Sequence, residues 1–257
     1  MKAELKTITP AIARDLLEKN YGNRSLNKDH VERLAKEIKE GRWKINGDMI
    51  RIGSSGRILD GQHRLNAVIK SGRTIQTWMM EGLDDDIFDT IDVGKKRSGG
   101  DTLASLGEEH PFRLAAALAL VDKYMTGRVL SYTLYSNGEI KELAEKYPLV
   151  RDAIVSKTNG KGILPPAVID ACNYLFSQKD PKAASEFIDR VLKGHGLEEW
   201  DPAYILRERL VMNTVSKSKL KRGYIFALCI KAWNAYRSGR KMRCLRVREN
   251  EDFPIVQ

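Results

Sequence analysis

The chain has 257 residues, of which 42% are hydrophobic and 30% are charged, a balance typical of folded globular proteins and unlike that of disordered ones. No apolar run approaches the roughly 20 residues needed to cross a bilayer, and the stretch MKAELKTITP lacks the apolar centre of a secretory signal. We therefore expect a cytoplasmic protein that does not enter membranes. The three cysteines, Cys172, Cys229 and Cys244, are widely spaced and fit a reducing compartment.

The first hundred residues alternate short helical and extended patterns. Thr9-Pro10 is typical of a helix start, and Asn27 precedes a second helix over 28–40, whose apolar positions recur every three to four residues. Strands are predicted over 49–52, 57–59 and 74–80, the first two joined by a turn. We expect a small mixed α/β domain over residues 1–100.

The stretch RILDGQHRLNA, residues 57–67, is where the predicted site gathers. A strand ends at Leu59, Asp60-Gly61 forms a tight turn, and the apolar spacing of a helix resumes at Leu65. The residues between this turn and Leu65 therefore occupy the first turn of a helix. Unsatisfied backbone N–H groups at such a position favour an anion.

The side chains of this turn suit phosphate chemistry. Asp60, Gln62, His63 and Arg64 bring a carboxylate, an amide, an imidazole and a guanidinium within five residues. The same residues also fit a structural interpretation, in which Asp60 caps the helix, His63 packs and Arg64 is solvated.

A second basic, glycine-bearing stretch follows the predicted α/β domain. DVGKKRSGGD, residues 92–101, places Lys95, Lys96 and Arg97 between glycines but lacks the order and spacing of a Walker loop. Such a loop can wrap a phosphate through its backbone N–H groups. An exposed interdomain linker has the same composition.

From Pro111 onward the pattern is helical, and several of the predicted helices open with proline near their first turn. The predicted helices cover 113–125, 137–147, 148–156, 166–176, 181–192, 203–215 and 220–236, and a short strand is predicted over 244–248. The fold class is therefore α+β, with a mostly α-helical second domain over residues 101–257.

The positive charge is concentrated near the end of this helical half. Between Lys217 and Arg248 there are eleven Lys or Arg and no Asp or Glu, and the rest of the chain carries 33 basic and 34 acidic residues. Such a density is the electrostatic footprint of a polyanion partner, although a solvated basic face has the same composition. We predict nucleic-acid contacts, DNA first, from Lys217, Lys219, Lys221, Arg222, Arg240, Lys241 and Arg243.

The order of elements in the first hundred residues resembles the N-terminal domain of the ParB/sulfiredoxin superfamily. Asn23-Arg24 is similar to the first sequence box of that domain, and GQHRLNA, residues 61–67, is similar to the second. The resemblance covers roughly residues 5 to 95. It implies the superfamily's fold, but not one reaction, because function depends on the site.

Details of the sequence narrow this resemblance. The Asp-Gly-Xaa-His-Arg form is similar to that of free-serine kinases and nuclease-like members, while the absence of a cysteine near it argues against sulfiredoxin activity. The helical half lacks the helix-turn-helix of chromosome-partitioning ParB proteins. The whole layout resembles ParB-like proteins of bacteriophages and mobile elements.

If a nucleoside triphosphate, ATP or CTP, binds with Mg²⁺, each site residue takes a role. Gly61 lets the backbone approach, and Arg64 clamps phosphate oxygens in a bidentate way. Asp60 holds Mg²⁺ or orients His63, and His63 acts as an acid or base near neutral pH. From the first box, Arg24 reaches over beside Asn23, and Gln62 orients a water molecule.

The sequence is compatible with functions from different classes. The first is a DNA-associated, nucleotide-binding protein that acts as a nuclease or phosphohydrolase, or as a switch in which nucleotide binding closes a homodimer. The alternative is a small-molecule or nucleoside kinase of the free-serine-kinase type. A protein-binding module with a degenerate site is the third.

Overall fold

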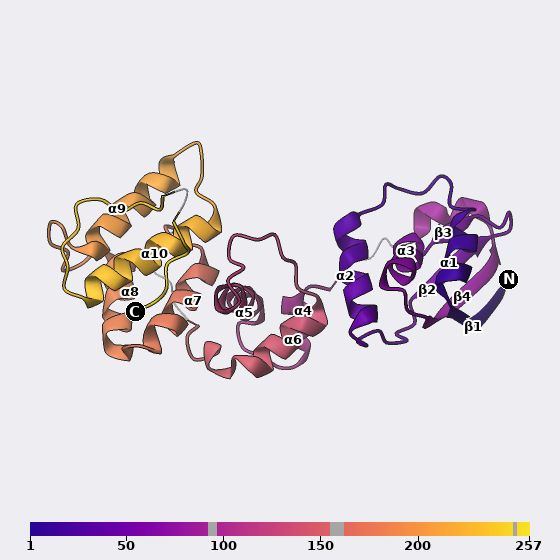
Figure 1. Ribbon diagram of the computed structural model, residues 1–257, viewed down its shortest axis with the longest axis horizontal. Coiled ribbons are helices and arrows are strands. Elements are labelled where there is room, and N and C mark those ends of the chain that lie inside the picture. The colour runs from indigo at the N-terminus through magenta and orange to yellow at the C-terminus, as the bar shows by residue number, and fades with distance from the viewer. Residues whose placement is uncertain (92–96, 155–161, 249–250) are drawn as a thin grey trace. The chain divides into compact units, whose positions relative to one another are not determined.

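The computed structural model describes residues 1–91, 97–154, 162–248 and 251–257 (Figure 1). The chain divides into two compact units, Met1–Lys96 and Arg97–Gln257, each described by itself below. Within the described residues, ten α-helices accompany one four-stranded mixed sheet. The α+β class predicted from the sequence is confirmed.

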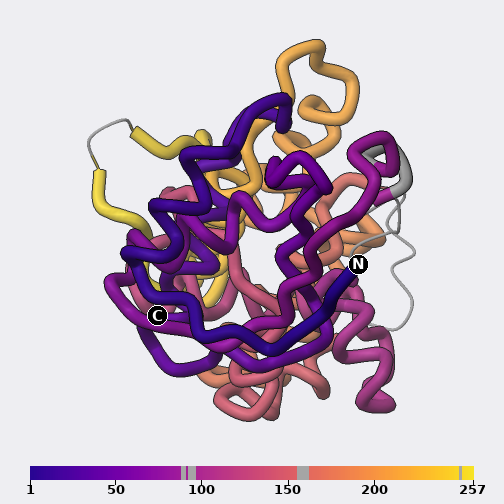
Figure 2. Tube along the Cα trace, turned by 90° about the vertical axis from the view of Figure 1, so that its right-hand side faces the viewer, coloured from indigo at the N-terminus to yellow at the C-terminus, as the bar shows by residue number. Residues whose placement is uncertain are grey.

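The sheet of the first unit has the strand order β1 (Lys2–Ile8), β4 (Ile75–Leu83), β2 (Met49–Gly53) and β3 (Ile58–Asp60). β1 runs antiparallel to β4 along one edge, β4 and β2 are parallel, and β2 forms an antiparallel hairpin with β3 (Figures 1 and 2). Sequence patterning missed β1, because Ile8 is the only buried residue of this edge strand.

Three helices complete the first unit, and two of them start at the predicted capping residues, whereas Asp60 does not cap the third. α1 (Pro10–Leu17) is capped by the Thr9 hydroxyl and α2 (Lys28–Lys39) by the Asn27 side chain. α3 (Gln62–Ser71) lies between two glycines with positive φ, Gly61 and Gly72. Their buried faces form one core with the inward residues of the sheet. A short 3₁₀ turn, η1 (Asp85–Thr90), follows β4.

The second unit is helical. Its elements are α4 (Gly99–Ser105), α5 (Pro111–Met125), α6 (Asn137–Lys146), the 3₁₀ turn η2 (Pro148–Val150), α7 (Pro166–Ser177), α8 (Pro181–Lys193), α9 (Pro202–Val215) and α10 (Arg222–Arg237). α10 supplies the centre of the core, where the fully buried Trp233 stacks on Phe176 with ring centroids 4.6 Å apart.

Three predicted elements of this unit are wrong. The strand predicted over 244–248 is an irregular segment, because it runs along α10 and not beside another strand. The helix predicted over 148–156 is reduced, in its described part, to η2 and a turn. The end of the predicted basic loop is instead the start of α4, where Ser98 and Asp101 form a reciprocal capping box.

No helix in the described ranges is both long enough and apolar enough to cross a bilayer.

A buried carboxylate ties several elements of the second unit together. Asp122 in α5 is 4% exposed and accepts hydrogen bonds from Tyr135 (2.8 Å), Lys146 (2.9 Å), Tyr147 (3.1 Å) and Arg128 (3.3 Å). Burial by itself raises the pKa of Asp122, but these hydrogen bonds outweigh burial and lower the pKa below its ordinary value. The charged form therefore stabilises the fold.

We predict that Asp122→Ala lowers the free energy of unfolding by about 1.5–3 kcal/mol at neutral pH, the range for hydrogen bonds to a charged group. Because the folded pKa is depressed, this stabilisation is complete above the ordinary value of 3.8 and is lost as the pH falls through the folded value.

Urea unfolding at about pH 7 and about pH 3 would measure this change, with the exposed Asp152→Ala as the matched control. The difference between wild type and Asp122→Ala should shrink at the lower pH. A difference of equal size at both pH values would contradict the assignment.

Candidate functional site

The two sequence boxes of the first unit meet at the start of α3. The Asn23 amide donates to the carbonyl of Ile58 and to the Asn20 side chain, both at 2.7 Å. The Gln62 amide donates to the carbonyl of Arg24 at 2.9 Å and accepts from Asn20 at 3.3 Å. The chain between α1 and α2 is thereby bound to the start of α3.

His63 is a buried part of this junction. Its ring is 9% exposed and lies 5.1 Å from the ring of His30. Its Nε2 accepts a hydrogen bond of 3.1 Å from the backbone N–H of Asn27, the N-cap residue of α2. An accepting Nε2 requires the neutral ring with its proton on Nδ1. This geometry matches the structural interpretation of His63 more closely than the role of a general base, which needs a lone pair open to substrate.

Asp60 is neutralised by two arginines. One carboxylate oxygen accepts from the N–H of Gly61 at 2.7 Å, and the other accepts from Arg51 at 2.7 Å and from Arg64 at 3.2 Å. Arg64 also donates to the carbonyl of Met49. A metal at Asp60 would have to displace these cations, and the described ranges hold no group of three or more His, Cys, Asp or Glu that could bind one. The predicted Mg²⁺ remains a prediction.

Gly61 and the start of α3 keep the features that favour an anion. Gly61 has φ +108°, and a Cβ at this position would lie 3.0 Å from Cγ1 of Ile50, so only glycine fits without strain. No side chain caps the first turn of α3. Arg24 is exposed in the preceding loop, whose backbone Gln62 holds. The backbone N–H groups at the start of α3 and the guanidinium of Arg24 therefore belong to the same part of the first unit, where the loop between α1 and α2 meets α3.

The basic stretch at 92–101 is only partly described. Lys95 and Lys96 lie outside the described residues, while the exposed Arg97 belongs to the second unit and its carbonyl accepts from Asn137 at 3.0 Å. Gly99 and Gly100 are packing positions within α4. A Cβ on Gly100 would lie 2.3 Å from Phe112.

All seven cations predicted to contact nucleic acid are exposed, and none pairs with a carboxylate in the described part of the chain. They form two groups at opposite ends of α10. The first group is Lys217, Lys219 and Lys221, which precede the helix, and Arg222, which is its first residue; the second group, after the helix, is Arg240, Lys241 and Arg243.

Tertiary packing adds two details to this basic region. Lys219 caps the end of α9 by donating to the carbonyls of Asn213 (3.0 Å) and Thr214 (2.5 Å). The aromatic residues among the charges belong to the core, since Trp233 is fully buried and Tyr236 packs on Phe187.

The first group of cations has neighbours that the sequence did not indicate. Burial, together with the charges of Arg222 and Arg128, lowers the pKa of Lys123 in α5. Lys123 and Arg128, which are distant from Arg222 in the sequence, therefore raise the positive potential near the start of α10. Sequence separation hid this cluster.

No known protein family, curated protein sequence or solved structure matches this chain significantly.

We predict that His63→Ala destabilises the first unit by about 1–3 kcal/mol, because it leaves the Asn27 N–H without its acceptor. Urea unfolding of the full chain measures the change. His195→Ala is the control, since this histidine is 62% exposed and its loss should alter stability by less than about 0.5 kcal/mol. A His63→Ala variant as stable as the control would refute the structural role.

Proposed function

We propose that this protein binds nucleic acid through the phosphate backbone, using the exposed cations of its second unit. The observation that carries the proposal is the set of seven exposed cations at the two ends of α10, without carboxylate partners among the described residues. Surface cations without a carboxylate partner add little to the stability of the fold. Each one that neutralises a phosphate of a nucleic acid releases a counterion, and this release favours binding.

The distance between the two groups of cations indicates that their ligand is a polymer with many phosphates and not a small anion. α10 has 16 residues, which at about 1.5 Å per residue makes it about 24 Å long. Duplex DNA carries a charge about every 1.7 Å along its axis and so presents phosphates over this whole distance. Such contacts position the protein without specifying a sequence.

The proposal predicts a salt-dependent affinity for duplex DNA. Neutralising Lys217, Lys221 and Arg222 with Gln should flatten the slope of log K against log salt by up to about 0.9 for each phosphate that the variant no longer neutralises. Lys219 is left intact because it caps α9. Fluorescence anisotropy across a salt titration measures the slope for duplex and single-stranded DNA.

The matched control changes three exposed lysines elsewhere in the second unit, Lys141, Lys179 and Lys182, to Gln. This variant removes the same charge and should keep the wild-type slope. Equal flattening in both variants would show a general charge effect. Absence of binding to either DNA form at about 50 mM salt, where screening is weak, would refute the proposal.

For the first unit we propose a nucleotide site at the start of α3, in line with the resemblance to ParB-like domains. The uncapped first turn of α3 and the exposed Arg24 in the adjoining loop support binding of phosphates. Binding without catalysis, as in a nucleotide switch, suits the geometry better than turnover. The kinase alternative needs a general base, and Nε2 of His63 is engaged with the Asn27 N–H.

This second proposal predicts that Arg24→Gln weakens binding of ATP or CTP by about 1.5–3 kcal/mol, the loss of a charge-assisted hydrogen bond. Calorimetry with and without Mg²⁺ measures the change. Arg14→Gln on α1, also exposed, should bind like wild type. Unaltered binding in Arg24→Gln would remove this residue from the site.

A further inference from the structure

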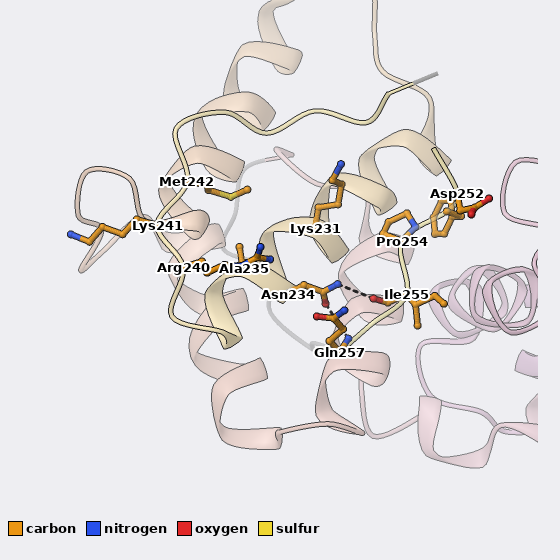
Figure 3. Close-up of a pocket in the computed structure, with 11 residues that line it drawn as sticks. Lys231, Asn234, Ala235, Arg240, Lys241, Met242, Asp252, Pro254, Ile255 and Gln257 are labelled. Atoms are coloured by element: carbon orange, nitrogen blue, oxygen red, sulfur yellow. Dashed lines mark hydrogen bonds between the residues drawn. The ribbon is translucent and has the colours of Figure 1, made fainter. Parts of the chain in front are cut away.

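The second unit contains a cavity of about 590 Å³ on the face of α10. Lys231, Asn234 and Ala235 of α10 line it, together with the turn at 240–242 and the segment 252–257 (Figure 3). This volume lies within the usual range of small-ligand sites, about 300–1,000 Å³. Sequence patterning did not indicate it, because the lining comes from three separate segments.

The wall of the cavity is held in place by hydrogen bonds. The Asn234 amide donates to the carbonyl of Ile255 at 2.8 Å and accepts from the N–H of Gln257 at 3.0 Å. Trp233 donates to Gln257 at 3.1 Å, and the N–H of the buried Val256 donates to the Tyr124 hydroxyl at 2.8 Å. A wall fixed in this way gives a preformed cavity and lowers the ordering cost of binding.

The lining combines positive charge with apolar surface. Arg240 and Met242 point towards α10 from one side and Pro254 and Ile255 lie on its other side, whereas Lys241 extends away from the helix (Figure 3). Arg240 donates to the Ser238 hydroxyl at 3.1 Å and pairs with no carboxylate of the described residues.

The remaining charges of the cavity almost balance. Lys231 is paired with Glu251 at 2.7 Å, and Asp252 contributes one further negative charge at the edge. Arg240 and Lys241 are the other two cations of the lining, and only Arg240 points towards α10 (Figure 3), so Arg240 is the cation placed to bind an anion in the cavity.

We propose that this cavity binds a single nucleotide through its phosphate and its base. The Arg240 guanidinium holds the phosphate in a bidentate way, and the base lies between Met242 on one side and Pro254 and Ile255 on the other. The inference rests on the proposed nucleic-acid function, because Arg240 belongs to the second group of cations. A free nucleoside monophosphate and the 5′-phosphorylated end of a strand share this chemistry.

The test compares two arginine variants of the full chain, one in the cavity lining and one on the exposed surface of α9. Wild type, Arg240→Gln and Arg209→Gln are titrated by calorimetry with AMP, GMP, CMP and UMP, with the corresponding nucleosides, and with inorganic phosphate. A second arm uses a single-stranded oligonucleotide with a 5′-phosphate or a 5′-hydroxyl. The side-chain amide resonances of Asn234 and Gln257 report occupancy of the cavity by NMR.

The expected result is tighter binding of at least one monophosphate than of its nucleoside or of phosphate alone, with shifts of both amide resonances. Arg240→Gln should weaken this binding about tenfold or more, as for loss of a charge-assisted hydrogen bond, whereas Arg209→Gln should change it less than about twofold. Preference for the 5′-phosphorylated oligonucleotide over the free monophosphate would identify a strand end as the ligand, and the reverse order would identify a free nucleotide.

Equal effects of the two variants, or no monophosphate binding, would overturn the cavity assignment. Binding of duplex DNA by wild type, measured in parallel, distinguishes failure of the cavity assignment from failure of the proposed nucleic-acid function. Duplex binding without monophosphate binding refutes the cavity alone, while monophosphate binding without duplex binding refutes the proposed function.

Discussion

Burial of two polar side chains at the start of α3 is the constraint on which the first unit depends. Gln62 and His63 are 6% and 9% exposed, and a buried polar group without a partner costs about 1–3 kcal/mol. Both side chains find partners in the backbone between α1 and α2, at Arg24 and Asn27. The site of this unit therefore lies at a joint that also holds its helices together.

Because the residues at the start of α3 also hold the helices together, fewer of their polar groups are available for chemistry. Asp60 forms ion pairs with Arg51 and Arg64, and His63 accepts from a backbone N–H, so the two residues best suited to acid–base or metal chemistry are already engaged. No side chain caps the start of α3, and the exposed Arg24 lies in the adjoining loop. These two features are the basis of the phosphate binding that we propose for this unit.

In the second unit, the burial of α10 explains where the positive charge lies. Nine of its sixteen residues are buried, including Trp233 at the centre of the core. A helix packed on most of its surface has little room for unpaired cations, because an isolated buried charge is very costly. Six of the seven cations therefore lie in the segments before and after α10, with Arg222 at its first residue, and the second of these segments also lines the cavity.

Local sequence determined the helices, because caps and apolar spacing act over a few residues: Thr9 and Asn27 start α1 and α2, and Gly61 and Gly72 enclose α3. Sequence also determined that the last part of the chain carries the excess charge. Tertiary structure alone decided that β1 joins the sheet, that 244–248 is no strand, that Asp60 and His63 are engaged within the protein, and that Arg240 faces a cavity. Apart from Asp60, whose partners lie within nine residues of it, these outcomes depend on contacts between separate segments of the chain, which local propensity does not encode.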